Sequence, residues 1–247
     1  MAKLAEGCIP TGCPSLDRAL GGGLPRGAVS LLYGEAGAGK TSLAVQCTVL
    51  CAKRGEKALY VDSGGGFNVE RLAQMAAEAL PEVMENLVVF TPQSFQEQIL
   101  LAETIDRYVA RKTTLAVFDT VTGLYRLELS GVHETFASNR QLNRMMAYLK
   151  QLAVARGVAV MAISQVRAAL TPDASCGGGL EPVAQRVLNY WTSLSLRLSN
   201  TSRAGVKEWT IERAARPGIA GLHSLFEVAD NGLRDFSEVT ARSARSS

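Results

Sequence analysis

The chain has 247 residues, of which 47% are hydrophobic and 20% are charged. This is the composition of an ordinary globular protein, and a chain of this length builds a core without disulfides or a structural metal. Its net charge of +3 is only mildly basic, so any contact with nucleic acid has to come from a local patch of charge.

The number and spacing of the cysteines argue against a fold held together by disulfides or by zinc. They form no C-x-x-C pair and their number is odd: Cys8, Cys13, Cys47, Cys51 and Cys176. A disulfide framework and a zinc site are therefore not expected, and this cysteine usage fits a reducing cytoplasm. Cys47 and Cys51 lie four residues apart on an expected helix, where they share a face and are expected to pack in the core.

The sequence shows no targeting or membrane signal. Met1–Pro10 carries Lys3 and Glu6 and no long apolar stretch, so no signal peptide is expected. No apolar run approaches the roughly 20 residues of a membrane span. We therefore expect a cytoplasmic protein that does not bind membranes.

Apolar runs alternate with amphipathic helical segments along most of the chain. The runs lack polar and apolar alternation, which is typical of strands in a parallel sheet that is covered on both faces. Five such strands are expected: Ala28–Tyr33, Lys57–Val61, Leu87–Phe90, Leu115–Phe118 and Val158–Ile163. This order predicts a doubly wound α/β fold, with a mostly parallel, twisted sheet and flanking helices.

Helices are expected between these strands. One has an apolar stripe over Val69–Leu80 and is followed by Pro81. Another begins with a capping box made by Ser94 and Glu97. A long helix is expected over Leu142–Gly157, where apolar residues recur at helical spacing.

After Val166 the pattern changes. The segment 168–182 is long and rich in glycine, and such a segment inside a compact domain is usually functional or disordered. Leu194–Leu198 and Val206–Arg213 alternate apolar and polar residues, so we expect C-terminal antiparallel strands beside the sheet.

Trp191 and Trp209 are expected to lie on strands and to fill the core. We expect one domain, residues 1–239, followed by a disordered tail, residues 240–247.

The segment after the first strand fits the pattern G-x-x-x-x-G-K-[ST], and the strand before it and the helix after it are the context that this motif requires. Its glycines let the backbone turn around an anion, and successive N–H groups point at phosphates. Lys40 would neutralise the β- and γ-phosphate oxygens, and Thr41 would give a hydroxyl to Mg²⁺. The sequence predicts a site for ATP, or a similar nucleoside triphosphate, with Mg²⁺. Its residues are Gly34, Glu35, Ala36, Gly37, Ala38, Gly39, Lys40, Thr41 and Ser42.

Two further polar residues end apolar strands. Asp119 follows Leu115–Phe118, where a carboxylate is expected to face this loop and hold Mg²⁺, directly or through water. The alternative for Asp119 is a turn cap at the strand end. Gln165 ends the next strand and is placed to sense a γ-phosphate, although a solvated side chain is the commoner role for a glutamine there.

Several motifs in the same order resemble the ATPase core of the RecA/RadA-type recombinases, and most of all that of the short archaeal paralogues of RadA. The resemblance covers about Thr11 to Asp235. It rests on an entry segment (Thr11-Gly12, Leu16-Asp17, Gly21–Gly23), a second strand and helix (Tyr60–Asp62, Phe67, Glu70–Leu72), a Walker B strand with its extension (Phe118–Arg126), and the strand Gly157–Val166, which carries the sensing glutamine, here Gln165.

The resemblance implies ATP-dependent binding of DNA, single-stranded or branched, in homologous recombination and DNA repair. This family contacts DNA with two loops, which correspond here to about Arg126–Arg140 and Arg167–Pro182. The candidate phosphate contacts are Arg126, Arg140, Arg144 and Arg167, and an ordinary salt bridge is the alternative at each of these positions.

One departure from the family concerns catalysis. Active relatives read Asp-Thr-Glu-Gly after the second strand, and the glutamate activates the attacking water. Here the stretch is Asp62–Gly66, and Gly64 stands at the position of the glutamate. Loss of a positioned general base commonly lowers the rate by about 10²–10⁴. Glu35 lies where relatives also carry glutamate, so it is not expected to substitute. Lys40 and Gln165 remain as catalytic candidates, and we expect tight nucleotide binding with very slow hydrolysis.

Two other departures concern assembly. Val132 stands where strand-exchanging relatives carry an arginine after Ser-Gly. RadA has an N-terminal helical domain and a Phe-x-x-Ala plug that joins subunits into filaments, whereas this sequence begins almost at the ATPase core. We therefore expect at most a weak homo-oligomer without strand exchange. The expected role is that of a regulator or mediator that binds DNA and other recombination proteins such as RadA.

Two other functions stay open from the sequence. The first is an active DNA-dependent ATPase that exchanges strands. The second is a KaiC-like signalling ATPase without a role on DNA, because Leu24–Gly27 resembles that group. Members of that group carry paired glutamates after the second strand, and Gly64-Gly65 lacks both.

Overall fold

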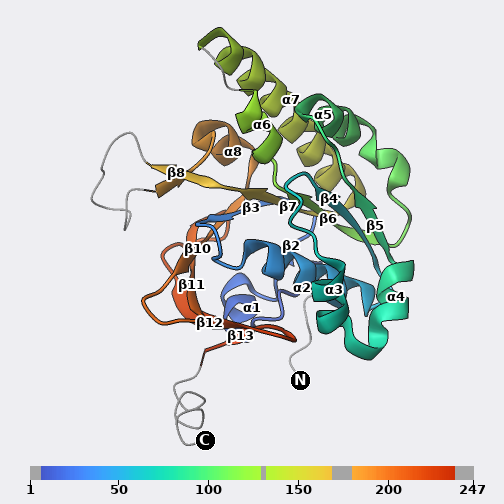
Figure 1. Cartoon of the computed structure of the whole chain (residues 1–247), viewed down its shortest axis with the longest axis vertical. Helices are drawn as coiled ribbons and strands as arrows, with labels where there is room; N and C mark the ends of the chain where they lie inside the picture. The colour runs from blue at the N-terminus through green and yellow to red at the C-terminus, as the bar shows by residue number, and fades with distance from the viewer. Residues whose placement is uncertain (1–6, 129–131, 169–179, 237–247) are drawn as a thin grey trace, which may run out of the picture.

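A nine-stranded sheet forms the centre of the molecule (Figure 1). The structure is a computed structural model and describes residues 7–128, 132–168 and 180–236. The strands lie in the order β13-β12-β11-β10-β3-β7-β6-β4-β5. The five parallel strands expected from the sequence are all present: β3 (Val29–Gly34), β4 (Lys57–Asp62), β5 (Leu87–Phe90), β6 (Thr113–Asp119) and β7 (Ala159–Ser164).

The C-terminal strands extend the sheet on the other side of β3. β10 (Leu194–Asn200) is parallel to β3 but antiparallel to β11 (Val206–Ala214), so the direction of the sheet changes there. β12 (His223–Ala229) and β13 (Gly232–Asp235) continue the antiparallel part. Figure 1 shows these last strands curving around α1 (Pro14–Leu20). The expected antiparallel strands are thus confirmed, with β10 as the junction between the two parts.

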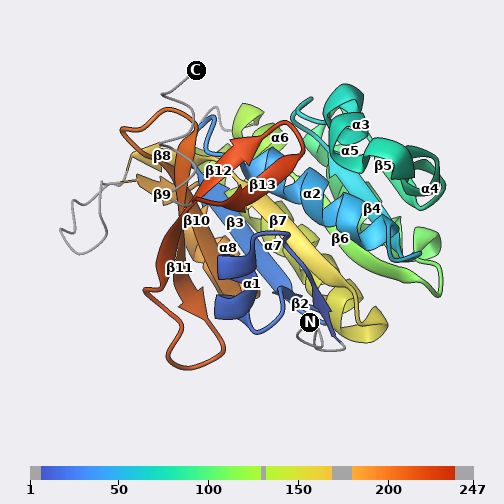
Figure 2. The ribbon, with the colours of Figure 1, turned by 90° about the horizontal axis from the view of Figure 1, so that it is seen from below.

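Helices cover both faces of the sheet, and Figure 2 looks onto one of these faces, with α1 and α2 in front of the strands. One face carries α1, α2 (Lys40–Ala52), α3 (Val69–Ala76) and α4 (Leu80–Glu85), and the other carries α5 (Phe95–Thr104), α6 (Gly123–Leu127), α7 (Val132–Arg156) and α8 (Gln185–Trp191). Successive strand residues point to opposite faces, so Leu31 and Leu32 pack in different cores. The fold is the expected α/β fold with two covered faces.

Some helix boundaries differ from expectation. α3 ends at Ala76, a 3₁₀ turn covers Ala77–Ala79, and Pro81 lies in the first turn of α4. Proline is tolerated at that position because its nitrogen has no helical partner there. Pro81 therefore belongs to a second helix. The Ser94 cap is confirmed, since its side chain accepts the N–H of Glu97.

Two short strand pairs complete the described chain: β1 (Cys8–Ile9) with β2 (Leu24–Pro25), and β8 (Val166–Ala168) with β9 (Leu180–Pro182). Most of the glycine-rich segment expected to be functional or disordered, residues 169–179 with Cys176, lies outside the described residues, as does the expected tail 240–247. Cys47 and Cys51 are buried, as predicted. None of the helices within the described ranges is long and apolar enough to cross a lipid bilayer.

Gln46 of α2 ties the beginning of the chain to its last strand. The side chain is buried, and its Nε2 donates to the carbonyl oxygens of Thr11 at 2.9 Å and Leu233 at 3.1 Å. Its Oε1 accepts the N–H of Leu233. Three backbone groups from opposite ends of the chain thus find partners in one side chain, which satisfies polar groups that burial would otherwise penalise.

Replacing Gln46 by methionine keeps the volume and removes these three hydrogen bonds. We expect Gln46→Met to lower the free energy of unfolding by about 2–4 kcal/mol, because buried backbone groups lose their partners. Urea unfolding measures this change. Gln151→Met, at an exposed position of α7, is the control and should stay within about 0.5 kcal/mol of the wild type. Equal effects of the two substitutions would contradict the role of Gln46.

Candidate nucleotide-binding site

The carboxyl ends of four neighbouring strands meet at one edge of the sheet. The register pairs Asp62 of β4 with Asp119 of β6. Gly34 ends β3, and Gln165 directly follows β7. In α/β sheets this edge is where ligands bind, because the loops after the strands converge there. The structure therefore brings the P-loop and the predicted strand-end residues to one place.

The P-loop has a backbone that other residues would strain. Gly34 has φ +152°, and a Cβ there would lie 1.9 Å from the carbonyl oxygen of Leu198. Gly37 and Gly39 have φ +72° and +93°, in the left-handed region that favours glycine. α2 begins at Lys40, immediately after this turn. The free N–H groups at the start of the helix therefore belong to the loop, which suits an anion.

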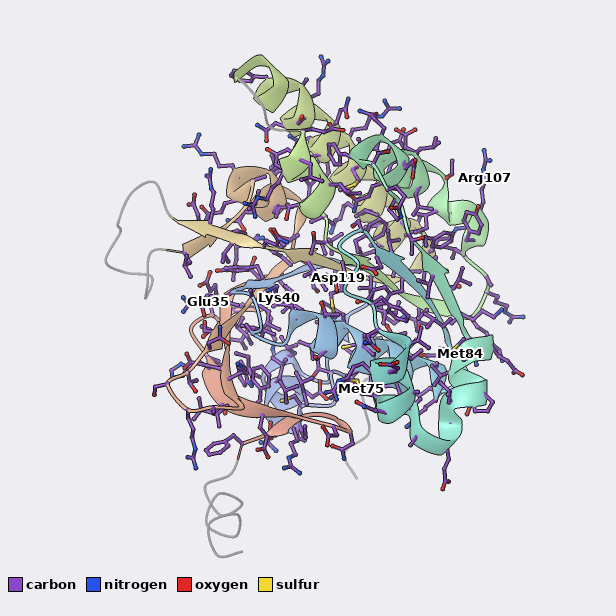
Figure 3. All side chains as sticks on the ribbon, in the orientation of Figure 1. Glu35, Lys40, Met75, Met84, Arg107 and Asp119 are labelled. Atoms are coloured by element: carbon purple, nitrogen blue, oxygen red, sulfur yellow. The ribbon has the colours of Figure 1, made fainter. Side chains whose placement is uncertain are left out.

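Lys40 lies across the P-loop. Its Nζ donates to the carbonyl oxygens of Gly34 at 2.8 Å and Glu35 at 2.6 Å. Burial lowers the pKa of Lys40, while the carboxylates of Asp119 and Glu35 act in the opposite direction. In Figure 3 the labels of Lys40 and Asp119 lie close together near the centre of the molecule, with Glu35 farther toward β10. A cation is thus held at the point where the motif places phosphates.

Asp119 is joined to the P-loop helix by a hydrogen bond. Its Oδ2 accepts the hydroxyl of Thr41 at 2.7 Å and the hydroxyl of Tyr60 at 2.9 Å. The residue is 4% exposed. Burial raises the pKa of Asp119, and the two hydroxyl donors counteract this in part. Thr41 and Asp119 are therefore within reach of one shared ligand.

This donor set fits Mg²⁺ bound together with a nucleotide. A hydroxyl and a carboxylate are oxygen ligands of the kind that Mg²⁺ prefers, and this ion usually completes its shell with phosphate oxygens and water. Within the described parts of the chain, no group of three or more His, Cys, Asp and Glu residues is placed to hold a metal ion alone. The site is thus suited to a metal that arrives with phosphates.

A hollow of about 230 Å³ opens above the P-loop. Besides P-loop residues, Lys207 of β11 and Val228 of β12 line it. A Cβ at Gly39 would lie 3.4 Å from Val228, so β12 packs closely against the loop. Sequence reasoning missed Lys207 and Val228, because no motif marks them and only the antiparallel strands bring them here.

The side chain of Glu35 is held by hydrogen bonds on the far side of the P-loop. Its Oε2 accepts the side-chain amide of Asn200 at 2.9 Å, and the Oδ1 of Asn200 accepts Lys207 Nζ at 2.7 Å. These bonds hold Glu35 beside the end of β10. The arrangement agrees with the expectation that Glu35 does not replace a general base.

The segment after β4 is a turn held by Asp62. The carboxylate of Asp62 accepts the backbone N–H groups of Gly64 at 3.3 Å, Gly66 at 3.0 Å and Phe67 at 3.1 Å. A Cβ at Gly64 would find its nearest neighbour, the carbonyl oxygen of Asp119, at 3.9 Å. Gly64 therefore has space for a side chain and contributes no ionisable group.

Gln165 faces a second hollow, of about 350 Å³, which Gly64 and Arg126 also line. The side chain of Gln165 is exposed, and its Oε1 accepts Nη1 of Arg126 at 2.7 Å. The candidate sensor and one candidate DNA contact are thus bonded to each other in this state.

The four arginines predicted to contact DNA differ in their partners. Arg144 is paired with Glu103 at 2.8 Å, and Arg167 with Glu181 at 2.7 Å. Arg126 is held by Gln165. Arg140 is exposed and has no ion pair with any described side chain. The salt-bridge alternative therefore applies to Arg144 and Arg167.

The first expected DNA loop, 126–140, contains little loop. α6 includes Arg126 and ends at Leu127, and α7 already begins at Val132. Only 129–131 between them fall outside the described residues. Arg140 and Arg144 are thus presented by a helix.

The buried charge of Asp119 makes stability depend on pH. The pKa of Asp119 is raised in the folded protein. Its ionised carboxylate therefore lowers the stability of the fold increasingly as pH rises above the ordinary aspartate value of 3.8. We expect Asp119→Asn to raise the melting temperature of the nucleotide-free protein at pH 7 and to lose Mg²⁺-dependent stabilisation by nucleotide. The gain should shrink toward pH 4, where the wild-type carboxyl becomes protonated.

Asp106 is the control, since Arg156 lowers its pKa. The pKa shift of Asp106 is thus opposite in direction to that of Asp119. Asp106→Asn should leave the melting temperature at pH 7 unchanged or lower it slightly, because exposed ion pairs contribute little to stability. Thermal melts of both variants and the wild type from pH 4 to pH 8 test these expectations. A loss of stability in Asp119→Asn at pH 7 would contradict the view that burial of the ionised Asp119 carboxylate destabilises the nucleotide-free protein.

Comparisons with known proteins agree with this geometry. The profile of the Rad51 family matches residues 5–236. A DNA repair and recombination protein RadB of Halobacterium salinarum is 35% identical over 230 residues, covering 91% of this chain and 94% of that protein. Its counterpart from Methanosphaera stadtmanae is 30% identical over 227 residues, with the same coverage.

A solved structure leads to the same family. A crystal structure of the RadB recombinase has a TM-score of 0.78 at 32% identity, covering 93% of this chain and 100% of that chain. The RecA-like fold and the resemblance to archaeal RadA paralogues are thereby confirmed. The chain belongs to the Rad51 family and is similar to the archaeal RadB proteins, recombinase paralogues of DNA repair and recombination.

Proposed function

We propose that this chain binds ATP with Mg²⁺ and binds DNA, and that it acts in recombination and repair as a regulator or mediator. On this proposal its ATPase activity is very weak and it does not exchange strands. Its partners are DNA and other recombination proteins, such as a RadA recombinase.

The observation that carries the proposal is the contrast between a complete phosphate site and an empty base position. Thr41 and Asp119 share a hydrogen bond, and Lys40 lies across the loop. At Gly64, in the turn where active relatives carry the catalytic glutamate, no side chain is available to accept a proton from water. Glu35, the P-loop carboxylate, is engaged by Asn200. Binding is supported by this arrangement and rapid hydrolysis is not.

Each residue of the site has a separate task on this proposal. The N–H groups of the P-loop and the Lys40 ammonium hold the phosphates, and Thr41 and Asp119 hold Mg²⁺, which neutralises phosphate charge. Gln165 senses the γ-phosphate. Because Gln165 is bonded to Arg126, a turn of Gln165 toward a phosphate would release that arginine for DNA.

The other two functions are less well supported. An active strand-exchange ATPase needs a base that the described site does not offer at Gly64. A KaiC-like signalling ATPase disagrees with the family match over residues 5–236.

Restoring the carboxylate is the direct test. We expect the purified protein to bind ATP and to turn it over at a near-zero rate, with and without single-stranded DNA. Gly64→Glu should raise turnover by about 10²–10⁴, because the position has space for a side chain. Gly64→Gln matches it in size without a base and should not raise the rate. Brisk turnover by the wild type would mean that another group supplies the base.

Lys207 offers a second test of the nucleotide site. Lys207 lines the P-loop hollow and its Nζ is bonded to Asn200, so on this proposal it adds positive charge near the phosphates. We expect Lys207→Met to weaken nucleotide binding roughly five- to twentyfold, the loss of one charge-assisted contact. Calorimetry measures the affinity, and Lys150→Met on α7, which packs against the other face of the sheet from α2, serves as the control. Unchanged affinity would remove Lys207 from the site.

A further inference from the structure

A buried tyrosine lies behind the carboxylate of Asp119 and has no task in the proposed function. Tyr60 of β4 is 0% exposed, and its hydroxyl donates to Oδ2 of Asp119 at 2.9 Å. The register explains this contact, because β4 pairs Asp62 with Asp119 and side chains two residues apart on a strand point to the same face. Tyr60 therefore reaches the neighbouring strand on the face of the sheet that carries Asp119.

The Tyr60 hydroxyl shares its acceptor with the hydroxyl of Thr41. Both donate to Oδ2 of Asp119, Thr41 at 2.7 Å, whereas Oδ1 accepts no hydrogen bond from any residue in the described ranges. An ionised carboxylate has about four acceptor positions on its two oxygens. Two donors on one oxygen thus orient the group and leave the other oxygen open to a ligand.

The ring of Tyr60 is itself held in place. It packs against the ring of Phe67, with centroids 4.8 Å apart at an interplanar angle of 55°. The backbone N–H of Phe67 donates in turn to Asp62 at 3.1 Å, so the turn after β4 fixes this ring. One chain of contacts thus runs from that turn through Tyr60 and Asp119 to Thr41 at the start of α2.

We propose that Tyr60 is a positioning residue for the metal: its hydroxyl holds the Asp119 carboxylate in the orientation that binds Mg²⁺ together with a nucleotide. An unrestrained carboxylate loses rotational freedom when a metal binds, whereas an oriented one has already lost it. Carboxylates that bind metals are commonly hydrogen-bonded by such outer partners, and loss of a partner typically lowers metal affinity about 10–100-fold. The inference rests on the proposed binding of ATP with Mg²⁺ and adds a residue to that site.

A second buried tyrosine offers a matched control for the Tyr60 hydroxyl. Tyr125 of α6 is 3% exposed, donates its hydroxyl to Oδ1 of Asn139 at 3.0 Å and packs edge-on against Phe95 at 5.7 Å. A buried hydroxyl needs such a partner whatever its function. Tyr125 lies in the core on the other face of the sheet. It therefore resembles Tyr60 in burial, ring packing and hydrogen bonding, but its partner is an amide and not a candidate metal ligand.

The test measures the affinity for a fluorescent ATP analogue twice, with MgCl₂ and with EDTA, and takes the ratio as the contribution of the metal. We expect Tyr60→Phe to lower this ratio about 10–100-fold and to leave the affinity in EDTA unchanged. In EDTA the P-loop and Lys40 hold the phosphates on the proposed function, and Tyr60 is hydrogen-bonded to neither. Tyr125→Phe should leave both affinities unchanged.

Two further measurements separate positioning from folding. Asp119→Asn removes the candidate metal ligand, whereas Tyr60→Phe keeps the carboxylate, so the ratio for Tyr60→Phe should lie between those of the wild type and Asp119→Asn. Phenylalanine preserves the ring contact with Phe67. Thermal melts without nucleotide should therefore show Tyr60→Phe and Tyr125→Phe folded, each melting below the wild type because a buried hydrogen bond is lost. The titrations are run below the lowest of these melting temperatures.

The outcomes separate the inference from the proposed function. If the wild type binds nucleotide more tightly with MgCl₂ and Tyr60→Phe keeps the same ratio, the role of Tyr60 is overturned and the proposed function stands. If Tyr60→Phe weakens binding equally in MgCl₂ and in EDTA, the hydroxyl only supports the fold and the inference is wrong. If nucleotide binding by the wild type does not depend on Mg²⁺, the proposed metal site fails and the inference fails with it.

Discussion

The hydrogen bond from Thr41 to Asp119 is the contact around which the site is organised. It joins the first turn of α2 to the end of β6, two elements almost 80 residues apart in the chain. Gly34 makes this geometry attainable, because the backbone of β10 passes so close that any Cβ there would collide with Leu198. A local glycine turn and a long-range strand contact therefore depend on each other.

The site is stable because the surrounding fold compensates for buried charge. Lys40 and Asp119 are both shifted toward their neutral forms by burial, which opposes the state needed to bind phosphate and Mg²⁺. Two hydrophobic cores, one on each face of the sheet, supply the opposing free energy. Gln46 adds a polar clamp between the two ends of the chain. Bound nucleotide and metal would relieve the cost of the charges, so ligand binding and stability are linked.

On the proposed function, binding and hydrolysis depend on different residues of this chain. In that proposal phosphates are bound by backbone N–H groups, Lys40 and Thr41, none of which depends on Gly64. Hydrolysis depends on a base, and the turn that Asp62 holds supplies none from its glycines. Arg126 and Gln165 are bonded to each other at the same edge of the sheet. The proposal therefore predicts a protein that keeps a bound nucleotide for a long time instead of hydrolysing it.

The sequence by itself determined the P-loop, the parallel strands and the carboxylate at the end of β6, since glycine spacing and apolar runs are local signals. It also singled out Gly64, because a missing side chain is visible in the letters. Only the tertiary structure decided the rest. Lys207 and Val228 reach the nucleotide hollow through the antiparallel strands, and Trp191, expected on a strand, ends α8 and ties it to α7. Whether each arginine forms an ion pair could not be predicted from the sequence either. Pairing depends on which distant elements pack side by side, and residue spacing along the chain does not give the distance between them in space.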